Sequence, residues 1–201
     1  MTLPKVRYAP AFTLSEAGSD RGTAYPFANK SVTIGGKTFV TWTDAIATTQ
    51  ARVFTHADKS WGPTVTIGPG VDNHNSPSLT VNKTGHLRIA YGPHGAWAAY
   101  PVQFCAGAFK VGFASAPASL ENMDKSSAPV GYFGTYACLE VTASNRDCFV
   151  YRGGESSHRV IFQIRHEKLG WSMAKELVHQ DLPPQYTHYG AQVVPTRDGK
   201  L

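Results

Sequence analysis

The stretch that decides the fold runs from residue 36 to residue 68 and reads GKTFVTWTDAIATTQARVFTHADKSWGPTVTIG. Val, Ile, Thr and aromatic residues alternate with other residues in three runs, KTFVTWT at 37–43, ARVFTH at 51–56 and TVTIG at 64–68. Period-two alternation of this kind, punctuated by Gly, Pro, Asn and Asp, is typical of short strands joined by turns. The stretch therefore predicts several adjacent β-strands.

Runs of the same kind recur along the rest of the chain. They are HLRIAYG at 86–92, FKVGFAS at 109–115, CFVYRG at 148–153 and HRVIFQIRH at 158–166. No segment keeps an apolar stripe at helical spacing over three turns, which is the pattern of an amphipathic helix. We therefore expect an all-β chain in which helices are short or absent.

The expected strands repeat in sets, each of which opens with a small or polar turn. These turns fall at Gly36, Gly85, Asp147 and Gly199, at intervals of 49, 62 and 52 residues. In two sets the third strand runs into a turn that ends in Trp, at Trp61 and at Trp171. A period of about 50 residues that carries four strands and a recurring Trp predicts β-propeller blades, with a β-sandwich as the alternative.

This repeat assigns residues 1–201 to a single, partial β-propeller domain. The blades are expected at about 20–70, 71–130 and 131–182, and the start of the next blade at 183–201. A closed ring usually has roughly four to eight blades. We therefore expect the sequence to be truncated after three to four blades of a longer propeller.

Composition narrows the class of protein. The chain has 42% hydrophobic and 16% charged residues and a formal net charge of +5, a profile unlike that of disordered, collagen-like or coiled-coil proteins. Lys and Arg are scattered, with no run of five, so we expect no nucleic-acid partner. The modest positive charge is compatible with an acidic polysaccharide. No apolar run reaches the roughly 18 to 20 residues that span a bilayer, so no membrane partner is expected.

The three cysteines give no recognisable framework. Cys105, Cys138 and Cys148 are odd in number and none is in CxxC spacing, which argues against a zinc ribbon. Buried thiols are the expectation, and a bridge between Cys138 and Cys148 is the alternative.

The first residues lack the apolar core and cleavage site of a signal peptide.

One segment, residues 71–95, carries two turn histidines. His74 precedes a strand and His94 follows the next one, with Asn73, Asn75 and Tyr91 beside them. Turn residues at the ends of neighbouring strands can converge on the central face of a propeller. The alternative is that these histidines are simply solvated.

A second segment, residues 134–158, adds a phenol and a guanidinium. Tyr136 precedes a strand, and Arg152 ends one in the sequence Tyr-Arg-Gly-Gly. The planar guanidinium suits a carboxylate, although a structural cation–π contact or a salt bridge between blades would explain it equally. Tyr189 is a further candidate, with ordinary strand packing as its alternative.

Five motifs of this chain occur together in a known family. They are DNHNSPSL, GHLRIAYGPHG, TY, YRGGESSH and HYGAQVVPTRDGKL, in this order over roughly residues 20–201. This ordered set resembles the BNR-repeat β-propeller polysaccharide lyases, which include ulvan lyases and rhamnose-glucuronate lyases. Enzymes of this family usually have seven blades, and the resemblance covers only their N-terminal half. It also implies a secreted or periplasmic protein, an oligomeric state left open, and a structural divalent cation such as calcium or zinc, with no cofactor required for the chemistry.

Carried over by motif, the resemblance implies site residues. The catalytic counterparts are His74, His94, Tyr136 and Arg152, and the substrate-binding candidates are Asn73, Asn75, Tyr91 and Tyr189. Two departures stand out. TYAC at 135–138 replaces the Thr-Tyr-Pro usual in the family, and ESSH at 155–158 replaces a more Gly-rich turn.

These residue types fit β-elimination on a uronate. The proton at C5 lies beside a carboxylate whose charge must be neutralised, which suits Arg152. Tyr136 and either His74 or His94 then form the acid and base pair, and the sequence leaves their assignment open. A non-catalytic glycan-binding or scaffold propeller is the alternative. A sialidase-like glycoside hydrolase is disfavoured, because the acidic residues do not recur at these turns.

Overall fold

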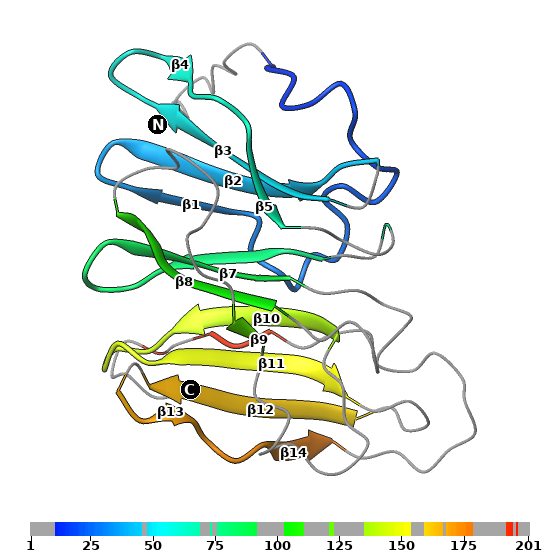
Figure 1. Cartoon of the computed structure of the whole chain (residues 1–201), viewed down its shortest axis with the longest axis vertical. Coiled ribbons are helices and arrows are strands. Elements are labelled where there is room, and N and C mark those ends of the chain that lie inside the picture. Colours follow the sequence, from blue (N-terminus) through cyan, green and yellow to red (C-terminus); the bar gives the residue numbers. More distant parts are fainter. Residues whose placement is uncertain are drawn as a thin grey trace, which may run out of the picture.

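The computed structural model describes residues 11–45, 48–68, 73, 76–91, 103–110, 121–122, 135–153, 159–166, 168–178, 192–194 and 196. These residues contain fourteen strands and no helix, and the strands form three antiparallel sheets. The sheets follow one another in chain order along the long axis of the molecule (Figure 1). The all-β expectation is thus confirmed. Within the same residues, no helix has the length and apolar character needed to cross a membrane.

The first sheet contains the stretch 36–68. Its strands are β1 (Ser31–Ile34), β2 (Lys37–Thr43), β3 (Thr49–Thr55), β4 (Ser60–Trp61) and β5 (Val65–Gly68). The order is β1-β2-β3-β4, and β5 also pairs with β3, so the outer strand is broken into two pieces. Gly35 and Gly36 join β1 to β2 with φ angles of 57° and 72°. Two consecutive positive φ angles favour the tight hairpin turn that follows the strand twist.

The other two sheets repeat this plan. The second holds β6 (Ser78–Val81), β7 (His86–Tyr91), β8 (Gln103–Lys110) and β9 (Glu121–Asn122). The third holds β10 (Thr135–Val141), β11 (Asp147–Gly153), β12 (Arg159–His166), β13 (Gly170–Trp171) and β14 (Lys175–Val178). Both β4 and β13 are two-residue strands that end in Trp. The predicted Trp-bearing repeat is therefore present in the first and third sheets.

One strand lies earlier than the sequence pattern placed it. The run FKVGFAS predicted a strand at 109–115, whereas β8 covers Gln103–Lys110, and residues 111–115 lie outside the described part. The difference has a physical reason. Residues 105–108 read CAGA, and these small side chains do not show the alternation of large apolar residues that marks a strand.

Two apolar clusters hold the sheets together. The cluster between the first and second sheets contains Phe39, Ala51, Val53, Val65, Ile67, Leu79, Leu87, Ile89 and Tyr91. The cluster between the second and third contains Ala90, Ala137, Leu139, Phe149, Tyr151 and Ile161. Burying one large apolar side chain contributes roughly 1.5–3 kcal/mol, so both interfaces are substantial. Four-stranded antiparallel sheets that pack face to face in chain order are blades of a β-propeller.

Polar contacts also cross between blades. Arg88 on β7 is 3% exposed, and its Nε lies 3.3 Å from Oδ1 of Asp147 on β11. Arg165 on β12 reaches the other carboxylate oxygen of Asp147 at 3.5 Å. Burial raises the pKa of the Asp147 carboxyl, and the two guanidinium groups oppose that shift. This three-residue group, which we call the interblade ion network, joins the second blade to the third.

A second carboxylate contacts all three blades. Glu140 on β10 accepts hydrogen bonds from the side chain of Asn29, just before β1, and from Thr80 Oγ1 on β6 at 3.5 Å. Burial raises the pKa of the Glu140 carboxyl, and the hydrogen bonds partly offset that shift. The residues at or just before the innermost strands of the three blades thus meet at one side chain.

The cysteines that the structure describes are free thiols. Cys138 and Cys148 are fully buried and unbridged, so the alternative of a bridge between them is wrong. Burial raises the pKa of the Cys148 thiol to about 12 and also raises that of Cys138. The side chain of Cys105 lies outside the described part. Both described thiols are therefore packing residues with little thiolate character.

Candidate active site

Tyr136 occupies a β-bulge at the start of the third blade. The pairing of β10 with β11 shifts register between Thr135 and Cys138, so Tyr136 and Ala137 together stand opposite Tyr151. Tyr136 has a φ of 52°, in the left-handed region that bulky residues rarely adopt. Bulges re-aim side chains, and strained backbone of this kind clusters at functional sites. The β-bulge and the left-handed φ together set the direction of the Tyr136 side chain.

Arg152, on the neighbouring strand β11, lies over the ring of this tyrosine. Its guanidinium carbon Cζ is 5.0 Å from the centroid of the Tyr136 ring. Tyr136 is 1% exposed and Arg152 is 8% exposed. The structure thus brings together two of the sequence-predicted residues, and their contact is the cation–π interaction that the sequence left open as a structural role.

Three residues that sequence reasoning missed complete this group. The ring centroid of Tyr25 lies 4.8 Å from that of Tyr136, and the Phe27 ring meets the Tyr136 ring edge-on at 6.2 Å. Arg21 Nη1 donates a hydrogen bond to Tyr25 Oη at 3.1 Å. The hydrogen bond that Arg21 donates to Tyr25 raises the pKa of the Arg21 guanidinium above its ordinary value. We call Arg21, Tyr25, Phe27, Tyr136 and Arg152 the tyrosine–arginine cluster.

The two substrate-binding candidates that the structure describes lie in different surroundings. Asn73 is partly buried, and its Nδ2 donates a hydrogen bond to Asp20 Oδ1 at 2.7 Å, next to Arg21 in sequence. Tyr91 is 1% exposed and belongs to the apolar cluster between the first two blades. The structure therefore places Asn73 beside the tyrosine–arginine cluster and Tyr91 in the core. The Tyr91 ring packs there against Gly68.

The remaining candidates, His74, Asn75, His94 and Tyr189, lie outside the described residues. Ser76 and Pro77, which directly follow His74 and Asn75, are described, and both accept hydrogen bonds from a lysine side chain. Lys30 Nζ donates hydrogen bonds to Ser76 Oγ at 3.1 Å and to the carbonyl oxygen of Pro77 at 2.7 Å. Burial lowers the pKa of the Lys30 amine to about 7. No spacing or motif marked this lysine in the sequence.

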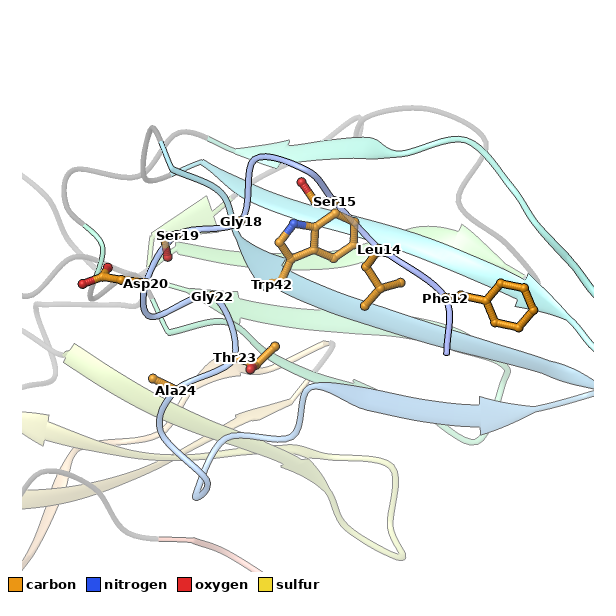
Figure 2. A pocket seen from close by; sticks show the side chains of 10 residues that line it. All are labelled: Phe12, Leu14, Ser15, Gly18, Ser19, Asp20, Gly22, Thr23, Ala24 and Trp42. Atoms are coloured by element: carbon orange, nitrogen blue, oxygen red, sulfur yellow. The ribbon is translucent and has the colours of Figure 1, made fainter. Parts of the chain in front are cut away.

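A cavity of about 530 Å³ is lined by residues of the segment that carries Arg21. Nine of its lining residues come from the segment between Phe12 and Ala24, and the tenth is Trp42 of β2 (Figure 2). Trp42 Nε1 donates to Asp44 Oδ1 at 2.7 Å, and Ser15 Oγ donates to the same oxygen at 2.9 Å. These bonds fix the indole against the N-terminal segment. We call this cavity the N-terminal pocket.

Comparison with known proteins supports the fold and the repeat. The model of a family described as "BNR repeat-containing family member" matches residues 23–201. The chain belongs to this BNR-repeat family. In a comparison with curated proteins, none matches the sequence.

Three of the solved structures similar to the BNR-repeat protein are polysaccharide lyases. An ulvan lyase of family PL25 has a TM-score of 0.66 at 15% identity, over 80% of this chain and 40% of that one. The same type of enzyme bound to -[GlcA(1-4)Rha3S]- has a TM-score of 0.61 at 15% identity, over 81% and 41%. The polysaccharide lyase Uly1 has a TM-score of 0.53 at 15% identity, over 84% and 46%. The chain therefore has a polysaccharide-lyase-like β-propeller fold and spans less than half the length of these structures.

The tyrosine–arginine cluster gives the BNR-repeat protein groups that suit an acidic sugar. Arg21 is exposed, and both guanidinium groups lie within reach of a tyrosine. Guanidinium groups bind carboxylates through paired hydrogen bonds, and phenols donate or accept protons. Among the described residues, no three His, Cys, Asp or Glu side chains are grouped as a metal site would require. The guanidinium and phenol groups of the tyrosine–arginine cluster can provide anion recognition and proton transfer.

Proposed function

We propose that the protein is a polysaccharide lyase that cleaves a uronic-acid-containing polysaccharide, of the ulvan or rhamnose-glucuronate type, by β-elimination. The observation that carries the proposal is the Arg152–Tyr136 pair on the bulge of β10. The left-handed backbone of Tyr136 costs stability, which a functional role would explain. The similarity in fold to ulvan lyases supports the same activity.

In the proposed reaction, each proton and electron pair has a destination. Arg152 binds the uronate carboxylate and stabilises the charge that develops when the C5 proton leaves. The C5–H electrons form the double bond between C4 and C5, and the bond from C4 to the glycosidic oxygen breaks. Tyr136 and either His74 or His94 act as the acid and base, one taking the C5 proton and the other protonating the leaving oxygen.

One observation favours a second candidate, a non-catalytic glycan-binding propeller. Tyr136 and Arg152 are almost fully buried in contact with each other, as a purely structural pair would be. In that case the exposed Arg21 and the half-buried Tyr25 would provide the glycan-binding surface of this cluster. The two candidates make opposite predictions for the Tyr136 hydroxyl.

The test is turnover of uronate polysaccharides by Tyr136→Phe. We expect the normal protein to release products with the ultraviolet absorbance of a 4,5-unsaturated uronate from ulvan or from a rhamnose-glucuronate polymer. Removing the hydroxyl keeps the ring contacts with Arg152 and Tyr25, so the loss of stability should stay near about 1 kcal/mol, as for one buried hydroxyl. Turnover should fall about 100-fold or more, as expected for loss of a proton-transfer group.

The matched control is Tyr151→Phe, which removes a hydroxyl opposite the same bulge. Tyr151 Oη donates to Gln163 Oε1 at 3.0 Å within the core, so this variant should lose about 1 kcal/mol of stability and keep its turnover. Unsaturated product that persists in Tyr136→Phe would remove Tyr136 from the mechanism. Binding without product from any uronate polymer would favour the glycan-binding protein, and saturated products would indicate hydrolysis.

A further inference from the structure

We propose that the interface between the second and third blades binds a small monovalent inorganic anion of the size of chloride, beside the interblade ion network. The groups that bind it on the second blade are the side-chain amide of Asn82 and the guanidinium of Arg88. The anion stabilises the contact between the two blades, and this role is independent of the proposed elimination reaction.

Asn82 and Arg88 are diagonal neighbours on the face of the second blade that meets the third. Arg88 on β7 pairs with Thr80 on β6, and the N–H of Asn82 donates to the carbonyl oxygen of His86 at 2.9 Å. Because side chains alternate between the two faces of a strand, these four residues share one face. Arg88 contacts Asp147 of the third blade, so this face is directed toward the third blade.

Asn82 and Arg88 each have a buried N–H group without a partner. Both residues are 3% exposed, and neither Asn82 Nδ2 nor Arg88 Nη1 has a hydrogen-bond partner among the residues that the structure describes. The orientation of the amide is fixed, because Asn82 Oδ1 accepts from the backbone N–H groups of Thr84 and His86 at 3.1 and 2.8 Å. Leaving buried donors without a partner is costly, so two of them on one face indicate an acceptor that these residues do not supply.

Charge and hydrogen-bonding capacity favour an anion over a water molecule. The interblade ion network contains two guanidinium groups and one carboxylate, and Arg88 and Arg165 lie 3.3 Å and 3.5 Å from the oxygens of Asp147. Charge-assisted hydrogen bonds are usually about 2.7–2.9 Å long, so this carboxylate compensates the two cations only in part. The groups without a partner are donors, and an anion only accepts, whereas a water molecule must also donate.

The proposed anion site is separate from the tyrosine–arginine cluster. Asp147 is the first residue of β11, and Arg152 lies five residues further along the same strand. At roughly 3.3 Å per residue, the two positions are about 16 Å apart. An effect of the anion on stability can therefore be measured independently of any activity at the cluster.

The experiment measures thermal unfolding of the 201-residue chain in potassium chloride and in potassium gluconate. The ionic strength stays at about 0.15 M while chloride replaces gluconate, so the screening of surface charges is constant. Gluconate is too large for an enclosed site between two blades. We expect the unfolding midpoint to rise by about 3 °C or more in chloride, because a ligand that binds only the folded protein stabilises it by mass action. Bromide should act in the same way.

Asn82→Asp tests the site directly. The substitution keeps an acceptor oxygen for the turn and places a negative charge next to Arg88, so this carboxylate replaces the anion. We expect the variant to fold and to lose the rise in chloride. The matched control is Asn145→Asp in the neighbouring turn of the third blade, where Asn145 Oδ1 accepts from the N–H of Lys83 at 2.8 Å. The control should keep the full rise.

A crystal soaked in bromide provides a readout that does not depend on any variant. We expect an anomalous-scattering peak within hydrogen-bond distance of both Asn82 Nδ2 and Arg88 Nη1. The same unfolding midpoint in both salts, or the absence of a peak at this interface, would overturn the anion site. A rise in chloride that persists in Asn82→Asp would place the anion elsewhere and overturn it as well. None of these results depends on uronate turnover, so the proposed function is tested separately.

Discussion

At the scale of single residues, backbone strain gathers around the tyrosine–arginine cluster. Four described non-glycine residues have a positive φ, and two of them, Tyr25 at 69° and Tyr136 at 52°, are in ring contact with each other. Tyr25 also precedes Pro26, which ordinarily favours an extended conformation. Left-handed backbone costs roughly 1–2 kcal/mol per residue. The packing around these two rings must therefore offset a local cost that ordinary turns avoid.

Gly68 must be a glycine, because the Tyr91 side chain lies close to its Cα. A Cβ on Gly68 would lie 1.8 Å from the hydroxyl oxygen of Tyr91 and 2.6 Å from its Cζ. We predict that Gly68→Ala lowers the free energy of unfolding by about 1–3 kcal/mol, because the buried Tyr91 ring must move. Denaturant unfolding measures this loss, and combining the change with Tyr91→Leu should restore part of it. Gly18→Ala, where a Cβ meets nothing, should stay within about 0.5 kcal/mol of the normal protein.

Lys30 gives the protein a predictable pH dependence. Burial lowers the pKa of its amine from 10.5 to about 7 in the folded state. Between these values the unfolded chain binds the additional proton, so stability should rise with pH from about 7 to about 10. We expect Lys30→Met to lack this rise, which would amount to about 3–5 kcal/mol. Unfolding free energies at several pH values test this, with exposed Lys168→Met as the control.

At the scale of elements, the first and third blades each have a left-handed residue close before the Trp of their short outer strand. Lys59 precedes β4 with a φ of 50°, and Gly170 opens β13 with a φ of 74°. Glycine adopts this conformation at no steric cost. The first blade therefore has a side chain in a backbone conformation for which the third blade uses a glycine.

We predict that Lys59→Gly stabilises the protein by about 0.5–1 kcal/mol, because it removes left-handed strain at an exposed position. The reverse change, Gly170→Lys, should destabilise by a similar amount. Thermal unfolding of both variants measures the difference. A loss of stability in Lys59→Gly would show that the lysine side chain makes a stabilising contribution larger than the strain.

The sequence predicted most strands for a simple reason. In β2, β7, β11 and β12, large apolar residues alternate along both buried faces, so the pattern coincides with the structure to within a residue or so. The strand β1 was not predicted, since its four residues have little buried surface. A short, exposed strand gains its order from its paired neighbour rather than from its own pattern.

At the scale of the whole molecule, the Asp147 carboxylate forms ion pairs with Arg88 and Arg165 between the second and third blades. Arg88 and Asp147 are both buried, so removing the carboxylate leaves a buried cation without its partner. We predict that Asp147→Asn lowers the free energy of unfolding by about 3–5 kcal/mol. Exposed Asp58→Asn is the control and should change it by less than about 1 kcal/mol. A similar small change in both variants would show that apolar packing alone joins these blades.

The sequence predicted only part of the candidate site, because some of its contacts join segments that are far apart in the chain. Tyr136 and Arg152 lie on strands joined by one hairpin, so their proximity follows from local pairing. Tyr25 reaches Tyr136 across 111 residues of sequence, from a segment before the first blade. No periodic pattern encodes such a contact, because it depends on how the blades stack. The same holds for Lys30 and for the N-terminal pocket.

The broken outer strands of the first and third blades bear on how the protein behaves in concentrated solution. Between β4 and β5 lie Gly62 and Pro63, and Pro63 has no N–H to offer a neighbouring chain. Long, flat sheet edges act as templates for strand addition and aggregation, whereas short and interrupted edges do not. Each of these two blades presents a two-residue piece and a four-residue piece in place of one continuous edge. The interruption therefore protects the rim of the propeller against fibril-like self-association.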